Sequence, residues 1–373
     1  METKRNIQFS ILSTIAMLFT VMGHTGVNMG TLEGIFNYDS FHMPLFVFIS
    51  GYFSGGGGIE NSESIKIIKK AIYRLVIPFF IWNFIYGIIA IFAHSLFGIE
   101  WCNASKFWHM ILIQPFTYGN VFFNFNAPSW FLLMLFEVKL IDCIIRKLFL
   151  GFKYEKLFSN ISYFLIAICA VNIARIGTRT AFEITITRAR YMLFWFEIGK
   201  IYKQYLEKKD NYNNIKYFML VFMVQGVLLL ICRKNGMVAG VWNSEFTNGP
   251  ILTILAAGTG IAFYLRLSRV LVPSFKDSRL IRYISTHTFS IMMHQFAGFF
   301  LLNLFFLKLT EVMGIAGFDK IAFQKDFWYR YCPGNLYCFR MLYVFCGVAL
   351  PLLGCKIYEK YIKNKYVLKG IKD

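Results

Sequence analysis

Ten apolar segments along the chain constrain its fold more than any other feature of the sequence. A helix needs about 20 apolar residues to cross the ~30 Å hydrocarbon core of a bilayer. The segments lie near residues 9–27, 40–54, 75–97, 128–150, 158–175, 184–202, 215–232, 248–267, 283–307 and 337–358. The second is short, and the sixth is interrupted by Arg188 and Arg190. The pattern predicts an all-α, polytopic transmembrane helical bundle of about ten spans.

The composition excludes a water-soluble or disordered chain. Of the 373 residues, 57% are hydrophobic and 16% are charged, whereas soluble domains average about 45–50% and about 25%. A soluble fold of this size has too little interior to bury so much apolar surface. The net charge of +19 would suggest nucleic acid in a soluble protein. Here we expect membrane lipid and no nucleic acid as a partner. In a membrane protein, the excess of Lys and Arg instead indicates which loops are cytoplasmic.

The basic residues are concentrated in every second loop between the predicted spans. If the N-terminus is cytoplasmic, 26 Lys and Arg lie in inner segments and nine in outer segments. Cytoplasmic loops of membrane proteins carry such an excess. We therefore predict that both termini are cytoplasmic and that the loops near 98–127 and 308–336 are extracytoplasmic. No internal repeat or long linker interrupts the pattern, which predicts one transmembrane domain over residues 1–373.

The two long outer loops are rich in aromatic residues: Trp101, Trp108, Phe122, Phe123, Phe125, Trp328 and Tyr329. Trp and Tyr gather at membrane–water interfaces as belts. Aromatic rings at such a place also suit a platform for sugar rings. Both interpretations stay open at the level of the sequence.

Histidines within the spans are candidates for function, because polar groups inside a bilayer are costly. His24 ends the first span and His42 opens the second, with a short outer loop between them. Two histidines at one membrane face suit a general base and a residue that orients it. A metal is not expected, since no third ligand with suitable spacing is near. His294 lies deeper, in the ninth span, where it predicts a protein-lined or water-filled cavity.

Spans four and six carry charges that are expected to pair across the interior: Glu137, Lys139, Asp142, Glu183, Arg188, Arg190 and Glu197. Arg188 and Arg190 are the exception. Cations two residues apart on a helix point in different directions, so one carboxylate does not easily satisfy both. They are candidate ligands for an anionic cofactor.

A second candidate for anion binding follows the second span on the cytoplasmic side. A glycine run, Gly55 to Gly58, precedes four basic residues, Lys66, Lys69, Lys70 and Arg74. Glycine lets backbone N–H groups approach phosphate, and the cations supply charge. The run lacks the strand and the Gly-Lys-Ser/Thr of a P-loop, so a flexible loop beside ordinary positive-inside lysines is the competing interpretation.

Several strings together resemble the membrane acyltransferase 3 family. The most specific is the second-span string from Phe41 to Phe53, which contains His42, Pro44 and Ser50. The others are Gly23-His24, the proline-containing entry to span three from Tyr73 to Trp82, Ser129-Trp130-Phe131-Leu132, Phe194 to Lys200, and Thr288 to His294. Their order runs through most of the chain, which looks most similar to the stand-alone fucose O-acetylase-like branch.

The resemblance implies a bacterial inner-membrane enzyme that moves an acyl group, expected to be acetyl from acetyl-CoA, onto a hydroxyl of a surface glycan or glycolipid. It implies His24 and His42 as catalytic residues. Lys66, Lys69, Lys70, Arg74, Arg188 and Arg190 are the candidates for the cofactor site, and Ser50, Trp130, Glu137 and His294 for the substrate site or cavity. The family commonly has Arg or Lys where Ser13 stands here, so Arg5, or Arg188 with Arg190, would have to replace that cation. The alternative function is a polysaccharide or lipid-linked oligosaccharide transporter.

Overall fold

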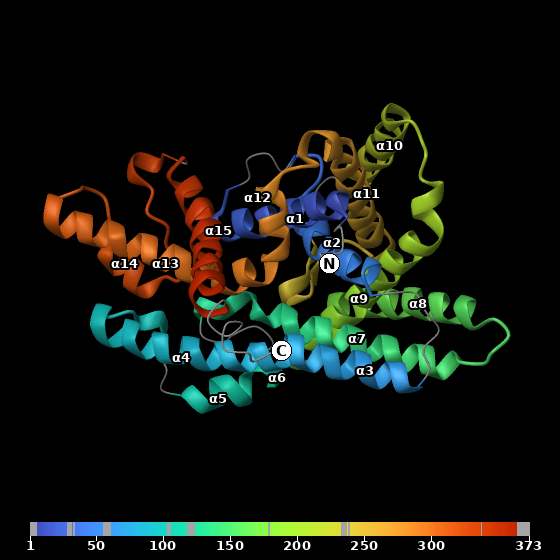
Figure 1. Ribbon diagram of the computed structural model, residues 1–373, viewed down its shortest axis with the longest axis horizontal. Coiled ribbons are helices and arrows are strands. Elements are labelled where there is room, and N and C mark those ends of the chain that lie inside the picture. Colours follow the sequence, from blue (N-terminus) through green and yellow to red (C-terminus); the bar gives the residue numbers. More distant parts are fainter. Residues whose placement is uncertain are drawn as a thin grey trace.

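The computed structural model describes residues 6–27, 32, 34–54, 61–102, 106–117, 124–177, 180–232, 237, 239–336 and 338–363, and it is almost entirely helical there. The long helices are α1 (Ile7–Thr25), α2 (Tyr38–Tyr52), α3 (Asn61–Ala71), α4 (Ile77–Phe97), α7 (Trp130–Phe149), α8 (Glu155–Ile176), α9 (Ala181–Ile201), α10 (Asn214–Cys232), α11 (Pro250–Phe275), α13 (Thr288–Met313) and α15 (Cys338–Tyr358). Figure 1 shows their arrangement. A helix coincides with each of the ten predicted spans, which confirms the all-α polytopic class.

Short elements join these helices. They are η1 (Ile72–Val76), η2 (Glu100–Cys102), α5 (Phe107–Leu112), α6 (Gln114–Thr117), η3 (Asn124–Ser129), η4 (Tyr202–Leu206), η5 (Glu207–Lys209), η6 (Val241–Asn243), α12 (Arg279–Thr286), α14 (Lys320–Lys325), η7 (Pro333–Asn335) and η8 (Glu359–Lys363). Two short strands, β1 (Ala239–Gly240) and β2 (Glu245–Phe246), pair antiparallel with Ala239 opposite Phe246. The α3, η1 and α4 segments run on as one long helix.

Seven of the described helical segments are long and apolar enough to cross a membrane by themselves. The predicted spans outside this set are α2, which has 15 residues, and the charged helices α7 and α9. Helix α9 packs against both α2 and α7 in the interior, where protein shields their polar groups from lipid. Arg188, which is fully buried, and Arg190 interrupt the apolar run of span six but not its helix, since α9 continues through both.

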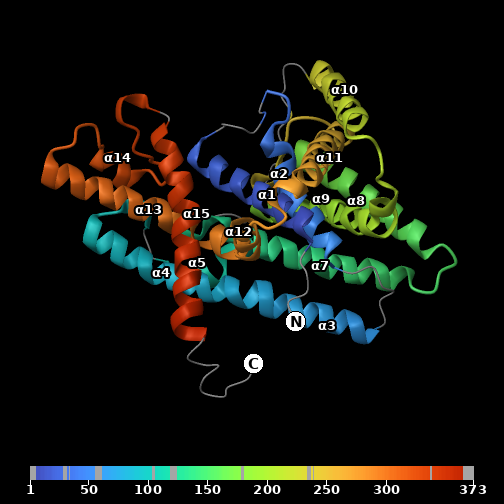
Figure 2. The ribbon, with the colours of Figure 1, turned by 45° about the horizontal axis from the view of Figure 1, so that its top comes forward.

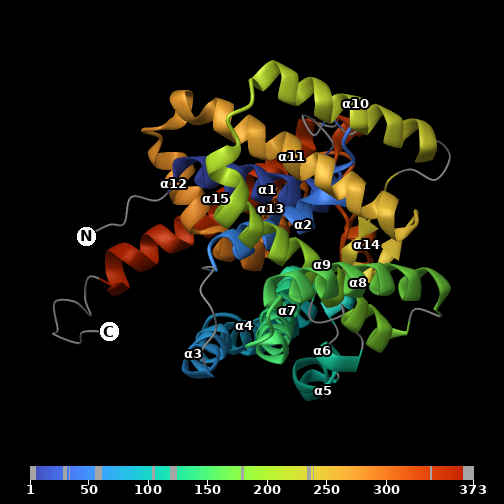
Figure 3. The same cartoon turned by 90° about the vertical axis from the view of Figure 1, so that its right-hand side faces the viewer.

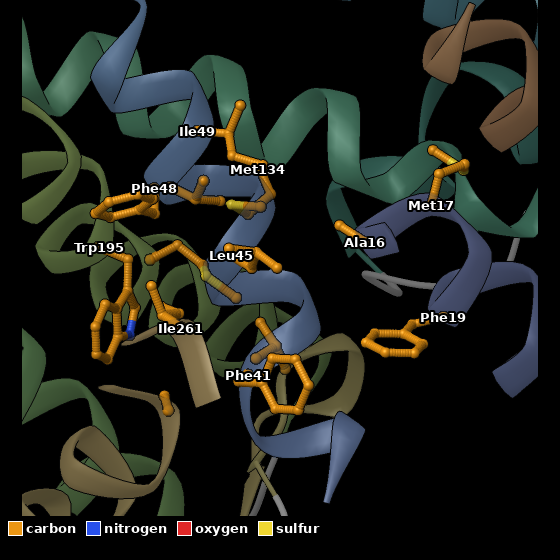
Figure 4. Packing of buried hydrophobic residues seen from close by; sticks show 14 of the residues in the cluster. Ala16, Met17, Phe19, Phe41, Leu45, Phe48, Ile49, Met134, Trp195 and Ile261 are labelled. Carbon is orange, nitrogen blue, oxygen red and sulfur yellow. The ribbon is translucent and has the colours of Figure 1, made fainter. Parts of the chain in front are cut away.

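The arrangement places α2 at the centre. Figure 3 shows α3, α4 and α7 at one edge of the molecule and α10 and α11 at the opposite edge, with α1, α2 and α9 between them. Phe41, Leu45, Phe48 and Ile49 of α2 lie among buried side chains of four other helices, labelled in Figure 4: Ala16, Met17, Phe19, Met134, Trp195 and Ile261. Helix α15 crosses and contacts α13, as Figure 2 shows.

Small residues allow the closest of these crossings. A Cβ built on Gly51 of α2 would overlap the carbonyl oxygen of Phe196, and one on Gly199 of α9 would overlap the carbonyl oxygen of Phe48. The backbones of α2 and α9 therefore touch directly, as small residues permit in membrane helix pairs. This contact fixes the position of α2, the helix that carries His42.

The outer aromatic residues divide into distinct roles. Trp101, Phe125, Phe323 and Phe327 pack together between the two long loops, and the Trp101 Nε1 donates to the Phe323 carbonyl at 3.0 Å. Trp108 and Trp328 remain exposed. Phe122 and Phe123 lie outside the described residues. Trp101 and Phe125 thus pack between the two loops, whereas Trp108 and Trp328 keep exposed rings.

The predicted topology can be tested by cysteine accessibility. With the eight native cysteines replaced, a single cysteine at position 365 is expected to resist a membrane-impermeant maleimide added outside intact cells, and to react after permeabilisation. A cysteine at Trp108 should react in both conditions, because that side chain is exposed on a loop that the charge pattern places outside. Labelling at position 365 in intact cells would overturn the cytoplasmic placement of the C-terminus.

Candidate active site

A cavity of about 660 Å³ lies beside α2. Its described walls come from α1, α2, η1, η3, α7, the β1–η6 turn, the start of α13, and residues 327–328. The lining includes both candidate catalytic histidines, His24 and His42, and the motif residue Trp130. Segments distant in the sequence therefore meet around one cavity.

His24 lies in the last turn of α1, and its hydrogen bonds determine its tautomer. Its Nδ1 is 3.0 Å from the Gln295 Oε1. The Gln295 Nε2 donates to the Met292 carbonyl at 3.1 Å, which turns the amide oxygen toward His24. An amide oxygen only accepts, so Nδ1 of His24 carries the proton and Nε2 keeps its lone pair. Gln295 is fully buried and holds the ring in the form that a general base requires.

His42 is held in the same way on α2. Its Nδ1 is 2.7 Å from the Tyr38 carbonyl oxygen, one turn earlier, so Nδ1 donates there as well. The Tyr38 ring lies 5.3 Å from the His42 ring between centroids, and it also packs against Gly23, the neighbour of His24. Tyr38 thus joins the two histidines across α1 and α2. Among the described residues, no group of three or more His, Cys, Asp or Glu side chains could hold a metal ion.

Two arginines hold the end of α1 where His24 lies. Gly26 ends the helix at φ +67, a left-handed conformation that glycine adopts without steric cost. The Arg330 guanidinium donates to the His24 carbonyl at 3.3 Å, and Arg340 donates to the Gly26 carbonyl at 3.2 Å. Burial lowers the pKa of Arg330 to about 10, so it stays charged at neutral pH. Cations at a helix C-terminus also complement its dipole.

Trp130 and the two span-six arginines form a layer behind the cavity. The Arg188 guanidinium lies 5.0 Å from the centre of the Trp130 ring, a cation–π distance. Arg190 donates to the Ile186 carbonyl of its own helix at 3.0 Å. Neither arginine lines the described cavity, and Glu137 is near both of them. Arg188 acts on the cavity through the aromatic ring that it covers.

The basic residues of α3 and η1 lie outside the cavity lining but close to it in the chain. Lys66, Lys69 and Lys70 are exposed on α3, and Arg74 is exposed on η1. The next residue, Leu75, is part of the cavity lining. The glycine run from Gly55 to Gly58 lies outside the described residues. The cavity lining at Leu75 is therefore continuous in the chain with a basic helix.

His294 and Ser50 do not line the described cavity. The His294 Nδ1 is 2.7 Å from the Tyr86 hydroxyl, and its ring contacts Trp82. Gln295, the neighbour of His294, faces His24 instead. The sequence analysis selected His294 and overlooked Gln295. The amide of Gln295 is also a polar group inside an apolar span, and such groups are candidates for function because burying them in a membrane is costly.

Of the remaining charges in spans four and six, Asp142 and Glu197 form ion pairs, whereas Lys139 lies over the Phe196 ring and Glu183 caps the start of α9. Asp142 accepts from Arg146 at 3.2 Å, from Lys200 at 2.5 Å and from the Tyr163 hydroxyl at 2.8 Å. Glu197 lies 3.2 Å from Lys200 and 3.5 Å from Arg146. This cluster joins α7, α8 and α9 away from the cavity. Its members are satisfied structurally, because each buried charge has an opposite partner.

Comparison with known families identifies the chain. A model of the acyltransferase 3 domain, described as an acyltransferase domain, matches residues 7–355, which is most of the sequence. The chain belongs to the acyltransferase 3 family. Comparisons with curated proteins and with solved structures found no significant match. The protein is therefore a membrane acyltransferase, and membership of this family favours the enzyme over the transporter alternative.

The acyltransferase departs from the family pattern at Ser13. Ser13, Met17, Thr20 and His24 follow one face of α1, and the last three line the cavity. The Ser13 hydroxyl donates to the Phe9 carbonyl at 2.7 Å, within its own helix. Of the proposed replacement cations, Arg5 lies outside the described residues, and Arg188 lies over Trp130. The usual cationic position thus continues the cavity-lining face of α1 but carries a neutral hydroxyl here.

Proposed function

We propose that this acyltransferase moves an acetyl group from acetyl-CoA to a hydroxyl of a cell-surface or exported glycan or glycolipid, in the inner membrane of a bacterium. The observation that carries the proposal is one cavity in which two histidines present Nε2 as an acceptor. A sugar hydroxyl is a poor nucleophile at neutral pH and needs such a base. Within the family, this arrangement suits O-acyl transfer.

The chemistry assigns His24 the role of base. Its Nε2 takes the proton of the acceptor hydroxyl as the oxygen attacks the thioester carbonyl carbon. The C–S bond breaks, and the proton passes from His24 to the leaving CoA thiolate. His42, held at its Nδ1 by the Tyr38 carbonyl, orients the acceptor or shares in proton transfer. The fixed tautomers mean that neither ring has to reorient before reaction.

The segments that contribute to the cavity lining support a donor inside and an acceptor outside. Leu75 belongs to the end of span three that the charge pattern places in the cytoplasm, whereas Trp242 and Trp328 belong to predicted outer loops. Exposed cations beside Leu75 suit the phosphates of CoA. The acetyl group would then reach His24 from the cytoplasmic side, and the glycan from the other.

The donor assignment predicts a charge-dependent KM. Replacing Lys66, Lys69 and Lys70 together by Gln is expected to raise the KM for acetyl-CoA several-fold at low ionic strength, because three cations near the phosphates are lost. The difference should shrink in 0.5 M salt, since exposed charges are screened. The measurement is acetyl transfer by purified protein in lipid nanodiscs.

The control for the lysines is a triple Gln variant of Lys147, Lys153 and Lys156, three exposed cations on the same predicted side but remote from Leu75 in the chain. Its KM should stay at the wild-type value. Equal KM values in both triple variants and the wild type would show that the α3 lysines do not bind the donor and contribute only to the topology.

Mass spectrometry tests the proposed function itself. Surface glycans from cells with the intact gene are expected to carry a mass of one acetyl group per modified residue, which glycans from gene-disrupted cells lack. A His24→Ala gene should fail to restore the modification. Identical glycan masses in the two kinds of cell would contradict the proposed acceptor class.

A further inference from the structure

Two exposed tryptophans stand at the cavity, on loops that the sequence places outside. Trp242 of η6 is 54% exposed and Trp328 is 55% exposed, and both belong to the cavity lining. Large aromatic rings usually contribute to stability by burial. Exposed aromatic surface next to a concave site is typical of ligand recognition.

The segment that carries Trp242 is firmly anchored. The β1–β2 pair closes it, and Ser244, at φ +53, lets the chain turn. The Ser244 hydroxyl lies 2.7 Å from the Thr187 hydroxyl and donates to the Ile184 carbonyl at 3.1 Å, both on α9. Val241 and Phe246 are buried. The residues on either side of Trp242 are thus held in the protein, while its own side chain remains exposed at the cavity.

Trp328 places this aromatic surface close to the chemistry. Its ring centre is 6.2 Å from that of His24 and 5.7 Å from that of Phe296. Its backbone N–H donates to the Asp326 side chain at 2.8 Å, which fixes the turn. A flat ligand on the Trp328 face would therefore have its edge within reach of the His24 ring.

The charge of the cavity indicates which substrate these rings take. None of the described lining residues is Lys or Arg, and the one carboxylate among them is Asp39. Asn124 and Tyr38 add neutral polar groups. A phosphate group among these lining residues would meet no cation, so the donor's phosphates remain at the α3 cations outside the lining, whereas hydroxyl groups would meet hydrogen-bond partners. The described lining suits an uncharged polyol with an apolar face.

We propose that Trp242 and Trp328 form the acceptor subsite, where they bind the apolar C–H face of a pyranose ring and direct one of its hydroxyls to His24. This assignment rests on the proposed function and adds which residues select the acceptor. Asp39 and Asn124 accept or donate hydrogen bonds at the ring's other hydroxyls. The acyl donor lies beside Leu75.

The test uses Trp242→Ala and Trp328→Ala in nanodiscs, with glycan extracted from gene-disrupted cells as acceptor and acetyl-CoA as donor. The KM for the glycan is expected to rise about tenfold in each variant, because stacking on an aromatic ring is lost. The KM for acetyl-CoA should not change, and Trp242→Phe should recover most of the loss. Trp108→Ala is the matched control, since Trp108 is equally exposed on an outer loop but does not line the cavity.

Three results would overturn the acceptor subsite. An unchanged glycan KM in both alanine variants removes the tryptophans from recognition. A rise in the KM for acetyl-CoA instead would indicate that the tryptophan rings bind the adenine of the donor. An equal loss in Trp108→Ala indicates general anchoring at the membrane interface. If wild-type protein shows no transfer from acetyl-CoA, the proposed function fails first. Calorimetric titration of the extracted glycan into wild-type and Trp242→Ala nanodiscs then decides the subsite by affinity alone.

Discussion

Replacing His24 by alanine is expected to lower acyl transfer by about 10²–10⁴-fold, the range for a lost acid–base group. The ring lines the cavity, and Gln295 holds its Nδ1 proton, so the variant loses the base without a substitute at the same place. The fold should survive, because Arg330 binds the backbone carbonyl of residue 24, which alanine retains. The measurement is acetyl transfer at matched amounts of membrane-inserted protein.

Neighbouring variants decide whether His24 is the base. Gln295→Leu should reduce kcat by less than His24→Ala, because the base remains but its tautomer is no longer fixed. His42→Ala is expected to have an intermediate effect. His294→Ala should have the smallest, since its ring bonds to Tyr86 outside the cavity lining. An inactive His294→Ala beside a fully active His24→Ala would move the catalytic assignment to span nine.

Replacing Gly51 by valine is expected to destabilise the protein by about 3 kcal/mol or more, the upper end of the cost of overpacking. The new side chain would overlap the carbonyl oxygen of Phe196. A flexible side chain could move aside, but a backbone atom inside α9 cannot move without separating the two helices. We expect a much lower thermal unfolding temperature in detergent, together with loss of activity, because α2 also carries His42.

The control for this crossing is Gly226→Val in α10, where a built Cβ meets no atom within 4 Å. Its unfolding temperature should stay near the wild-type value. Gly199→Val approaches the same α2–α9 contact from the other helix, at the Phe48 carbonyl, and should reproduce the loss. A stable Gly51→Val protein would mean that α2 and α9 do not meet as described.

The sequence determined the helices of this protein. Apolar runs of sufficient length have one low-energy form in a bilayer, because every backbone polar group must be satisfied within its own segment. Each of the ten predicted runs accordingly contains a helix. The positions of His24 and His42 on either side of a short loop were also readable, since adjacency in the chain makes two span ends neighbours.

The tertiary structure decided which polar side chains share the cavity. Consecutive residues on a helix point about 100° apart, so His294 and Gln295 face different neighbours. The apolar residues of α13 are spread around the helix, so its sequence gives no sign of which face turns toward α1. Likewise Trp242 reaches the cavity only because Ser244 bonds to Thr187, 57 residues away in the chain. Spans buried by other helices need no apolar surface of their own, which is why α7 and α9 could carry charges. The sequence therefore specifies each span by its length and polarity, while packing between spans specifies the site.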